Sequence, residues 1–498
     1  MKHYFGLSEY QLRQQQKEIP VYYEPGKLIN GHLLLCGMSG TGKSYQSMRL
    51  LRSAAAAGVQ VDVLDVHEEL HSIPGCVAAK YSQATGHGYN PLVLDTDPHA
   101  GGVTRQADFI VGLIRQVTTQ FGSKQEAALR NLIIDTYMMK GIFVDNPRTW
   151  ERLCITERER ETLIAERKWP ELRKYYPTLG DLLDYAEKKV LTMMFGGDNK
   201  AMAALETLCK ENARLQSLSM RYAKSTSEAD REKLETQIAS LSERCVETYS
   251  TAIQAKPSRE PKDLIKYDSR DVLVSVVQRL QILAASGIFR SNEPDFRGAS
   301  VRVHQIKSLS DEQQVLFTKL RLRKIFDDLK LRGPTTSGSE LRHVVFLDEA
   351  PKYFTEDKDD IINVVAREAR KFGLGLWCAA QQPTSFPESF ITNCGAKILL
   401  GIDSSYWKGS ISKLRITEEG LKFIKPKEVI SIKLQKEGQA DPPFTNVIVP
   451  NPDFEVGRRA MAFGNRNVTV PSAVRNESKS SVPESSRDAA ISAVSSEG

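Results

Sequence analysis

The chain has 498 residues and carries 68 lysines and arginines against 62 aspartates and glutamates, a formal net charge of +6. Such a length exceeds one ordinary hydrophobic core and predicts two or three folded units, or one large α/β domain with insertions. With 41% hydrophobic and 26% charged residues, the composition excludes a disordered or fibrous protein, and the mild positive charge permits nucleic-acid binding without predicting it.

The sequence predicts a cytoplasmic protein without a membrane span. No apolar stretch approaches the roughly 20 residues that a membrane-spanning helix needs, and the start, MKHYFGLSEYQLRQQQKE, is too polar for a secretory signal. The seven cysteines never pair as CxxC, which indicates reduced thiols. The eight histidines show no spacing that is typical of a metal site.

The first residues lead directly into a βαβ unit. Residues 1–30 have room only for a short polar helix, expected over 9–18, and an extended piece. The apolar run 32–37 ends in glycine and predicts a buried parallel strand, and the alanine-rich residues 43–57 predict a helix. A second strand is expected at 59–66, so strand, glycine-rich loop, helix and strand follow one another.

Residues 31–105 are therefore expected to form the first part of an α/β core, and residues 106–265 an all-α insertion. Helices are expected over 104–140 and 178–195. From 199 to 253 the chain is highly charged, with leucines spaced at three and four residues and a polar break, STSEAD, in the middle. This pattern predicts an antiparallel helical hairpin. We expect it to pack on its own domain, with a partner-binding arm as the alternative.

Strand-like apolar segments return in the second half of the chain, at 300–306, 343–350, 374–380 and 396–402. Helices are expected between them, and alternating strands and helices with near-continuous apolar strands predict a parallel sheet covered on both faces. Residues 266–450 would form the second part of the core. Residues 451–498 are serine-rich and predict a disordered tail. The expected fold class is thus α/β, with a parallel central sheet and an inserted all-α region.

The run GMSGTGKS between the first strand and helix fits the phosphate-binding pattern GxxxxGK[ST]. Its glycines let backbone N–H groups surround the phosphates, its lysine neutralises the outer ones, and its serine ligates magnesium. The predicted ligands are therefore ATP and Mg²⁺, and a glycine-rich turn without a ligand is the alternative. The predicted nucleotide-binding residues are Gly37, Ser39, Gly40, Thr41, Gly42, Lys43 and Ser44.

Two further strands end in polar side chains at the edge where open α/β sheets bind ligands. VVFLDEA delivers Asp348 and Glu349. We expect Asp348 to hold the magnesium, together with Ser44, and Glu349 to polarise the attacking water. LGLWCAAQQP ends in Gln381, which could bond both the γ-phosphate and that water. A solvated glutamine at a strand end is the alternative for Gln381.

A basic helix end precedes the last of these strands. DDIINVVAREARKFG begins in acids and ends in Arg367, Arg370 and Lys371, and the helix dipole alone explains this charge order. An oligomeric ATPase also needs an arginine from a neighbouring subunit to offset transition-state charge. Arg370 is the candidate for that catalytic role.

Several segments in the same order resemble one ATPase family. LINGHLLLCGMSGTGKS is similar to the "HLLILGxTGxGKS" of the HerA branch of the HerA/FtsK superfamily, and DVLDVHEEL (62–70) resembles its "DPHGEY". YNPL (89–92) resembles the "NPL" of conjugative secretion and coupling ATPases. Residues 301–326 look like the family's strand and helix before its acidic strand, and 367–402 resemble "REGRKYGxGLxxxSQRPSxxP…xxCxxxIxxR".

The resemblance implies a RecA-like fold of the ASCE class of P-loop NTPases. It places Lys43 and Ser44 at phosphate and magnesium, Asp348 and Glu349 as magnesium holder and catalytic base, and Gln381 as γ-phosphate sensor. It also implies a homo-oligomeric ring, usually of six subunits, around duplex DNA. The expected activity is that of an ATPase acting as a DNA translocase or helicase.

The resemblance covers residues 27–105 and 265–402, and the sequence departs from the family pattern in two places. HerA proteins carry an N-terminal β-barrel that docks a partner nuclease, whereas only about 30 residues precede the first core strand here. A partner nuclease or other effector protein therefore stays an open alternative. Gln382 stands where the family usually has arginine.

Three functions follow as hypotheses. The first is a DNA-pumping motor. The second is an ATPase that energises type IV secretion or the assembly of a protein complex without moving DNA, which YNPL and the helical hairpin favour. The third is a scaffold that binds ATP and hardly hydrolyses it, and the presence of both Glu349 and Gln381 argues against this one.

Overall fold

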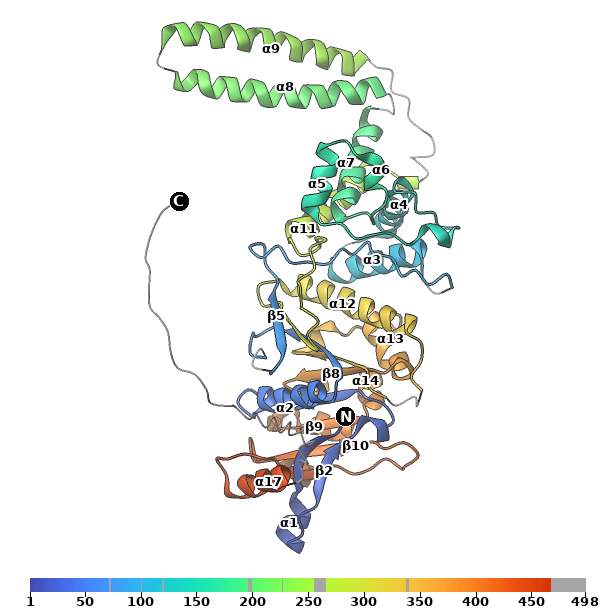
Figure 1. Ribbon diagram of the computed structural model, residues 1–498, viewed down its shortest axis with the longest axis vertical. Helices are drawn as coiled ribbons and strands as arrows, with labels where there is room; N and C mark the ends of the chain where they lie inside the picture. Colours follow the sequence, from blue (N-terminus) through green and yellow to red (C-terminus); the bar gives the residue numbers. More distant parts are fainter. Residues whose placement is uncertain are drawn as a thin grey trace, which may run out of the picture.

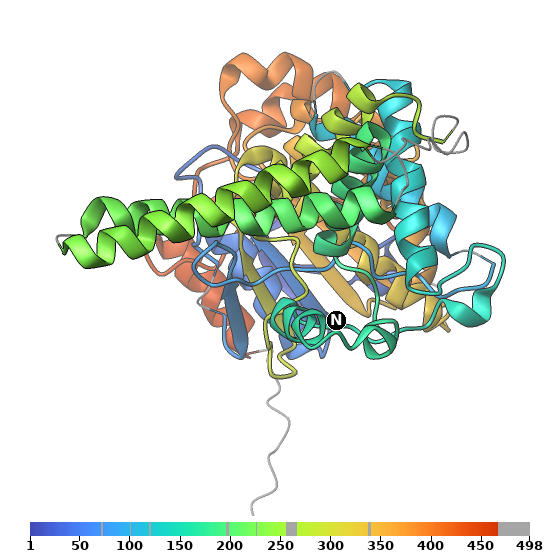
Figure 2. The same cartoon turned by 90° about the horizontal axis from the view of Figure 1, so that it is seen from above.

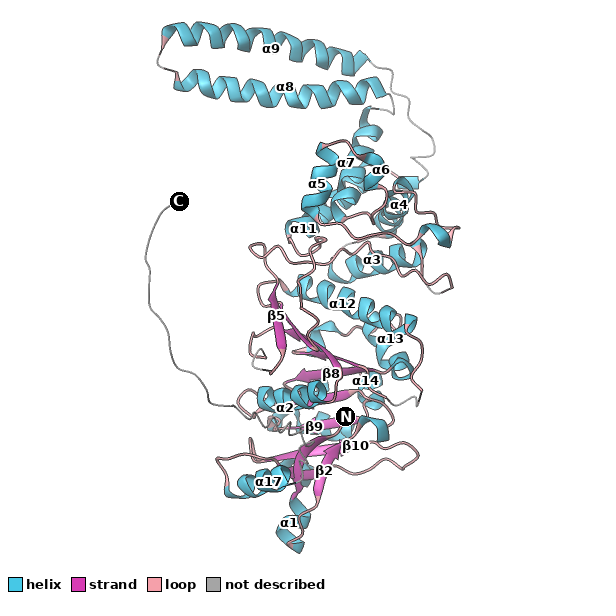
Figure 3. Cartoon of the chain, in the orientation of Figure 1, coloured by secondary structure: helices cyan, strands magenta, loops and turns pink. Residues whose placement is uncertain are grey.

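The protein is elongated, with a sheet-containing half and a helical half (Figure 1, Figure 3). The computed structural model describes residues 1–70, 73–99, 101–118, 121–195, 199–225, 227–254, 266–336 and 340–466. In this part of the chain, no helix has the length and apolar character needed to cross a membrane.

One eleven-stranded sheet runs through the sheet-containing half, in the order β2-β1-β11-β10-β9-β3-β8-β7-β4-β6-β5. Its strands are β1 (His3–Ser8), β2 (Pro20–Tyr23), β3 (Leu33–Cys36), β4 (Gln60–Asp65), β5 (Cys76–Lys80), β6 (Val301–Gln305), β7 (His343–Leu347), β8 (Leu374–Ala380), β9 (Ala396–Leu399), β10 (Val429–Leu434) and β11 (Thr445–Ile448).

The seven strands from β9 to β5 are parallel, which confirms the predicted parallel sheet. β3 lies between β8 and β9, with Leu33 paired to Trp377 on one side and to Ala396 on the other. Every residue of β3, β7 and β8 is buried, because helices cover both faces of these strands. The four remaining strands pair antiparallel along one margin of the sheet.

Helices cover the two faces of the parallel strands. α2 (Lys43–Ala56) buries Leu50, Leu51 and Ala54 against one face. The opposite face is covered by α12 (Asp311–Leu331), α13 (Ile361–Glu368) and α14 (Glu388–Asn393). α12 begins at a capping box in which Ser310 and Gln313 satisfy each other's backbone N–H groups.

The all-α region stacks on the α12 side and contains α3 (Val103–Val117), α4 (Ser123–Met139), α5 (Glu157–Ala165), α6 (Trp169–Leu172) and α7 (Leu179–Phe195). α11 (Arg270–Ala285) packs on α4 and α7. The insertion therefore extends beyond its expected end at residue 265. The amphipathic α11 buries Leu273, Val276 and Leu280 in this contact, and the sequence motifs that marked the core gave no sign of it.

α8 (Asn199–Lys224) and α9 (Glu228–Gln254) form the antiparallel hairpin that the leucine spacing predicts. Leu218 and Leu241 are buried between the two helices, and Arg244 pairs with Glu211 at 3.3 Å. Contrary to our expectation, the hairpin does not pack along its own domain: it stands beyond α7, and its tip projects past the body (Figure 1, Figure 2). Its outer faces are mostly charged and exposed, which suits this position.

Both ends of the described chain join the antiparallel margin of the sheet. The expected N-terminal helix is α1 (Glu9–Gln15), and the extended piece is β2, whereas β1 was not predicted. The expectation of a disordered tail from residue 451 is wrong for α17 (Glu455–Arg466), which packs on β1 through a hydrogen bond from Tyr4 to the Ala460 carbonyl. The rest of the expected tail, 467–498, lies outside the described residues. α15 (Trp407–Leu414) and α16 (Glu418–Lys422) connect β9 to β10.

Candidate nucleotide-binding site

The glycine-rich loop connects β3 to α2 at the carboxyl edge of the parallel sheet. Two hydrogen bonds fix its start: Gly37 N–H donates to the Ala380 carbonyl and Met38 N–H to the Gly401 carbonyl, both at 3.0 Å. The loop is therefore held by the strands on both sides of β3. The Thr41 hydroxyl closes it by donating to the Met38 carbonyl at 2.7 Å.

Glycine is required at two positions of this loop for different reasons. Gly42 has φ +98°, a backbone conformation that residues with a Cβ rarely adopt. A Cβ at Gly37 would lie 2.6 Å from the Thr41 hydroxyl oxygen and 2.8 Å from the Leu400 Cβ. The motif glycines thus keep the backbone open, so that its N–H groups can face a ligand.

The two chemically active residues of the loop already have protein partners. Lys43 Nζ lies 3.1 Å from Glu349 Oε1, and the Ser44 hydroxyl donates to Glu69 Oε2 at 2.8 Å. Both contacts join the first turn of α2 to the ends of neighbouring strands. A bound nucleotide must replace these carboxylates as the partners of Lys43 and Ser44.

Asp348 and Glu349 directly follow β7, as the sequence predicted. Asp348 is only 7% exposed, and burial raises the pKa of its carboxyl group to about 6 against the opposing charges of Lys43 and His67. Glu349 is more accessible; although burial opposes it, the Lys43 ammonium holds the pKa of Glu349 below its usual value. The two neighbouring carboxyl groups therefore differ in protonation near pH 6.

Glu349 also has an unusual backbone, with φ 45° and ψ 46° in the left-handed region. A residue with a long side chain rarely adopts this conformation without support from its surroundings, and it costs on the order of 1 kcal/mol or more. η3 (Ala350–Tyr353) starts immediately after it. The strained turn separates the two carboxyl groups, so that Asp348 stays buried while Glu349 reaches Lys43.

Gln381 follows the last residue of β8, between β3 and β7. Its Nε2 lies 3.5 Å from Glu349 Oε1, at the limit of a hydrogen bond. Lys43, Glu349 and Gln381, which are far apart in sequence, thus meet because their strands are neighbours in the sheet.

A cavity of about 430 Å³ unites these groups. Eight of the predicted site residues line it: Ser39, Gly40, Gly42, Lys43, Ser44, Asp348, Glu349 and Gln381. Gly37 and Thr41 lie in the same loop but do not line the cavity. The donor set also fits a magnesium ion, which prefers oxygen ligands such as the Ser44 hydroxyl and the Asp348 carboxylate.

Arg370 is the one predicted catalytic residue that does not approach this cavity. It lies in η4 (Ala369–Phe372), before β8 begins, whereas Gln381 follows the end of that strand. The seven residues of β8 separate the two by roughly 23 Å at about 3.3 Å per residue. Arg370 pairs with Glu437 at 2.6 Å.

Of the other residues that line the cavity, Tyr45, His67, Glu69 and Lys427 have polar side chains that the sequence did not single out. Asp65, the last residue of β4, explains two of them, because its carboxylate accepts hydrogen bonds from the N–H groups of His67, Glu68 and Leu70. These bonds curl the following loop, so that Glu69 reaches Ser44 on α2 and His67 Nε2 lies 3.8 Å from Glu349 Oε1. The signal in the sequence for His67 and Glu69 is DVHEEL, which resembles a motif of the HerA branch.

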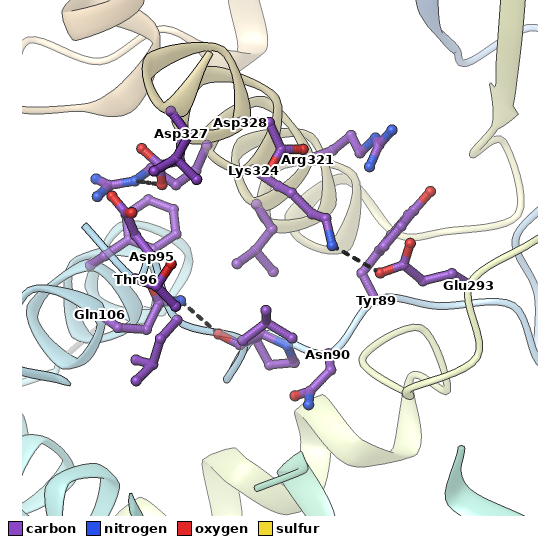
Figure 4. A pocket seen from close by; sticks show the side chains of 17 residues that line it. Tyr89, Asn90, Asp95, Thr96, Gln106, Glu293, Arg321, Lys324, Asp327 and Asp328 are labelled. Carbon is purple, nitrogen blue, oxygen red and sulfur yellow. Dashed lines mark hydrogen bonds and ion pairs between the residues drawn. The ribbon is translucent and has the colours of Figure 1, made fainter. Parts of the chain in front are cut away.

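A second, smaller cavity of about 120 Å³ lies between α12 and the segment that contains YNPL (Figure 4). Among its lining residues, Lys324 pairs with Glu293 at 3.1 Å, and Gln106 donates to the Pro91 carbonyl at 2.7 Å. Tyr89 lies under the Arg321 guanidinium, 5.0 Å from ring centroid to carbon. The YNPL residues therefore join the sheet-containing half to the all-α region and do not contribute to the larger cavity.

Comparison with known proteins agrees with this architecture. Residues 11–133 match the family model of the helicase HerA central domain. No curated protein matches the chain by sequence. The structure is similar to VirB4 of Thermoanaerobacter pseudethanolicus, with a TM-score of 0.55 and 14% identity over 90% of this chain and 96% of that one.

Two other solved structures are less similar. The bacterial conjugative coupling protein TrwB, without its first 70 residues, gives a TM-score of 0.47 at 10% identity and covers 90% of this chain and 92% of its own. The genome-packaging NTPase B204 of Sulfolobus turreted icosahedral virus 2 gives 0.22 at 19% identity, over 30% of this chain and 69% of its own.

Proposed function

We propose that this chain is a P-loop ATPase of the HerA/FtsK type, which works as a ring of six copies and hydrolyses ATP to move DNA. The observation that carries the proposal is the meeting of Lys43, Ser44, Asp348, Glu349 and Gln381 around one cavity. A cation, a hydroxyl, two carboxyl groups and an amide are the set that phosphoryl transfer to water requires.

The residues divide the work as follows. Lys43 and the loop N–H groups bind the β- and γ-phosphates, and Ser44 and Asp348 would hold magnesium. When bound, magnesium neutralises charge on the outer phosphates. Glu349 exchanges its contact with Lys43 for the attacking water, which it orients and polarises, and Gln381 bonds the same water and the γ-phosphate.

The site lacks one component in a single copy. Of the described residues that line the cavity, none is an arginine, although related NTPases use one to offset transition-state charge. We propose that a neighbouring copy supplies Arg370, which lies at the far end of β8 and cannot reach its own cavity. Arg370→Ala should abolish turnover and leave ADP binding unchanged, whereas Arg367→Ala on the same helix end is the matched control. Normal turnover by assembled Arg370→Ala protein would contradict this assignment.

An ATPase that energises secretion or protein assembly is the second candidate. The likeness to VirB4 extends over 90% of this chain and so includes more than the nucleotide-binding core. In this alternative DNA is not the substrate, and the ring acts on a protein partner. The same cavity would serve both functions, so the two differ only in what stimulates hydrolysis.

The deciding experiment measures ATP hydrolysis with and without duplex DNA, for the wild type and for Glu349→Gln. The motor predicts that DNA raises the wild-type rate several-fold or more and that the variant is inactive yet still binds ATP. Hydrolysis that DNA leaves unchanged would reject the motor and favour the secretion ATPase. A Glu349→Gln variant that hydrolyses ATP normally would reject the catalytic assignment in both.

A further inference from the structure

A turn from the C-terminal part of the chain lies over the glycine-rich loop. Residues 425–428 connect α16 to β10, and the side chain of Lys427 lines the nucleotide cavity. Its Cγ lies 3.8 Å from where a Cβ of Gly42 would be, at the beginning of α2. Lys427 thus places a second ammonium group beside the loop, on the side opposite to Glu349 in the sheet order.

The backbone of this turn has a rare conformation that hydrogen bonds hold in place. Lys427 has φ +66°, in the left-handed region that a lysine enters only when its surroundings enforce it. Its carbonyl accepts a hydrogen bond from the Asn451 side chain at 2.9 Å, and the Lys425 carbonyl accepts from Glu428 and Val429. A left-handed lysine where glycine or asparagine would fit more easily points to a use for the side chain.

Segments on both sides of the turn also touch the loop. Pro426 packs near Gly401, whose carbonyl accepts from Met38 N–H in the loop. On α2, the Tyr45 hydroxyl donates to the Pro450 carbonyl at 3.2 Å. The turn and the residues after β11 therefore sit on the first turn of α2 as one unit.

The charge of Lys427 is available to a ligand. Its side chain is exposed, and among the ion pairs formed by the described residues none includes it. Lys43, in contrast, already contacts Glu349 at 3.1 Å. A polyphosphate in the cavity would bring the counter-charge that Lys427 does not have among the described residues.

We propose that Lys427 is a second nucleotide-binding cation, which holds the α- and β-phosphates from the C-terminal side. This inference rests on the proposed ATPase function and extends it. Glu349 acts at the γ-phosphate that leaves and Lys43 bridges the β- and γ-phosphates, whereas Lys427 contacts only the phosphates that stay behind as ADP. It is a binding and positioning residue, and its contribution is equal for ATP and ADP.

The test replaces the charge and keeps the turn. Asparagine tolerates left-handed backbone, so Lys427→Asn removes the cation with little strain, and Lys427→Arg restores it. Lys425→Asn is the matched control, because Lys425 belongs to the same turn and does not line the cavity. Thermal unfolding of all three variants checks that the fold is kept.

We expect Lys427→Asn to weaken MgADP binding, measured by calorimetry, by roughly five- to ten-fold, and to raise KM for ATP by the same factor with kcat within about two-fold. Lys427→Arg should recover most of the affinity, and Lys425→Asn should match the wild type. An ADP affinity of Lys427→Asn within about two-fold of the wild type, an equal loss in Lys425→Asn, or a fall in kcat alone would overturn the inference. A wild-type protein that binds no ADP would overturn the proposed ATPase function as well. If the wild type binds ADP and Lys427→Asn binds it equally well, only the inference about Lys427 fails.

Discussion

Asp62 offers the sharpest test of how the sheet beneath the site is held together. It lies in the middle of β4 and is fully buried, with a relative exposure of 0%. Its Oδ1 accepts hydrogen bonds from Arg321 Nε and Nη2 at 3.0 and 2.9 Å and from His304 Nε2 at 2.7 Å, and Oδ2 accepts from His343 Nε2 at 2.9 Å. One carboxylate thus joins β4 to β6, β7 and α12.

The expected cost of removing it follows from burial. Although burial opposes ionisation, the Arg321 charge and the two imidazoles hold the pKa of Asp62 well below its usual range, so the group is a carboxylate in the folded protein. Asp62→Ala leaves Arg321, which is 6% exposed, as a buried charge without its partner. Breaking a buried pair in this way costs about 3–5 kcal/mol of unfolding free energy.

Urea unfolding followed by circular dichroism measures this cost. Asp108→Ala is the control, because Asp108 pairs with Arg130 at 2.8 Å with both side chains about half exposed, where a pair contributes about 0–1 kcal/mol. The double change Asp62→Leu with Arg321→Met should lose less than Asp62→Ala alone, since no buried charge remains. A loss below about 1 kcal/mol for Asp62→Ala, or one equal to that of Asp108→Ala, would refute the reasoning.

Three further outcomes are expected at the nucleotide site. Because burial raises the pKa of Asp348 to about 6, its carboxylate form is lost as the pH falls below 6. The value of kcat/KM for ATP should therefore decrease by roughly ten-fold per pH unit below pH 6. A flat profile of kcat/KM between pH 5 and 8 would contradict this. Glu69→Gln removes a negative charge beside the phosphate-binding loop, so ADP binding without magnesium, measured by calorimetry in EDTA, should tighten about three-fold, and weaker binding would argue against a repulsive role. Gly37→Ala forces a methyl group to within 2.8 Å of the Leu400 Cβ. We expect at least ten-fold weaker ADP binding and a loss of about 1–3 kcal/mol in the free energy of unfolding. Unchanged ADP affinity would show that the loop can move aside.

The sequence alone was sufficient to predict the central strands of the sheet and the polar residues that follow them. β3, β7 and β8 are continuous apolar runs because both of their faces are buried, and such runs are visible without knowledge of their partners. Lys43, Asp348 and Gln381 could be placed together because parallel strands bring their carboxyl ends to one edge. The motifs and the parallel sheet were enough to predict that these residues meet at one edge of the sheet.

The margin of the sheet could not be predicted in the same way. β1 lies near the start of the sequence and β11 lies more than 400 residues later, yet the two strands pair, with Leu7 opposite Ile448. Short strands of this kind are stabilised by partners that no local sequence pattern reveals. The same holds for Lys427, which reaches the cavity through a tertiary turn with no motif of its own. α17 was missed because its polar composition resembles a tail, although Ala460 is fully buried against the sheet.

The position of β3 has a consequence for the order in which the molecule assembles during synthesis. Its two neighbours, β8 and β9, end at Ala380 and Leu399, so the strand that carries the phosphate-binding loop leaves the ribosome long before either partner exists. At about 5–20 residues per second, the wait is roughly 20–70 s. During this interval the apolar run LLLC of β3 needs protection from aggregation. Acquisition of nucleotide binding should therefore mark the late closure of the whole sheet.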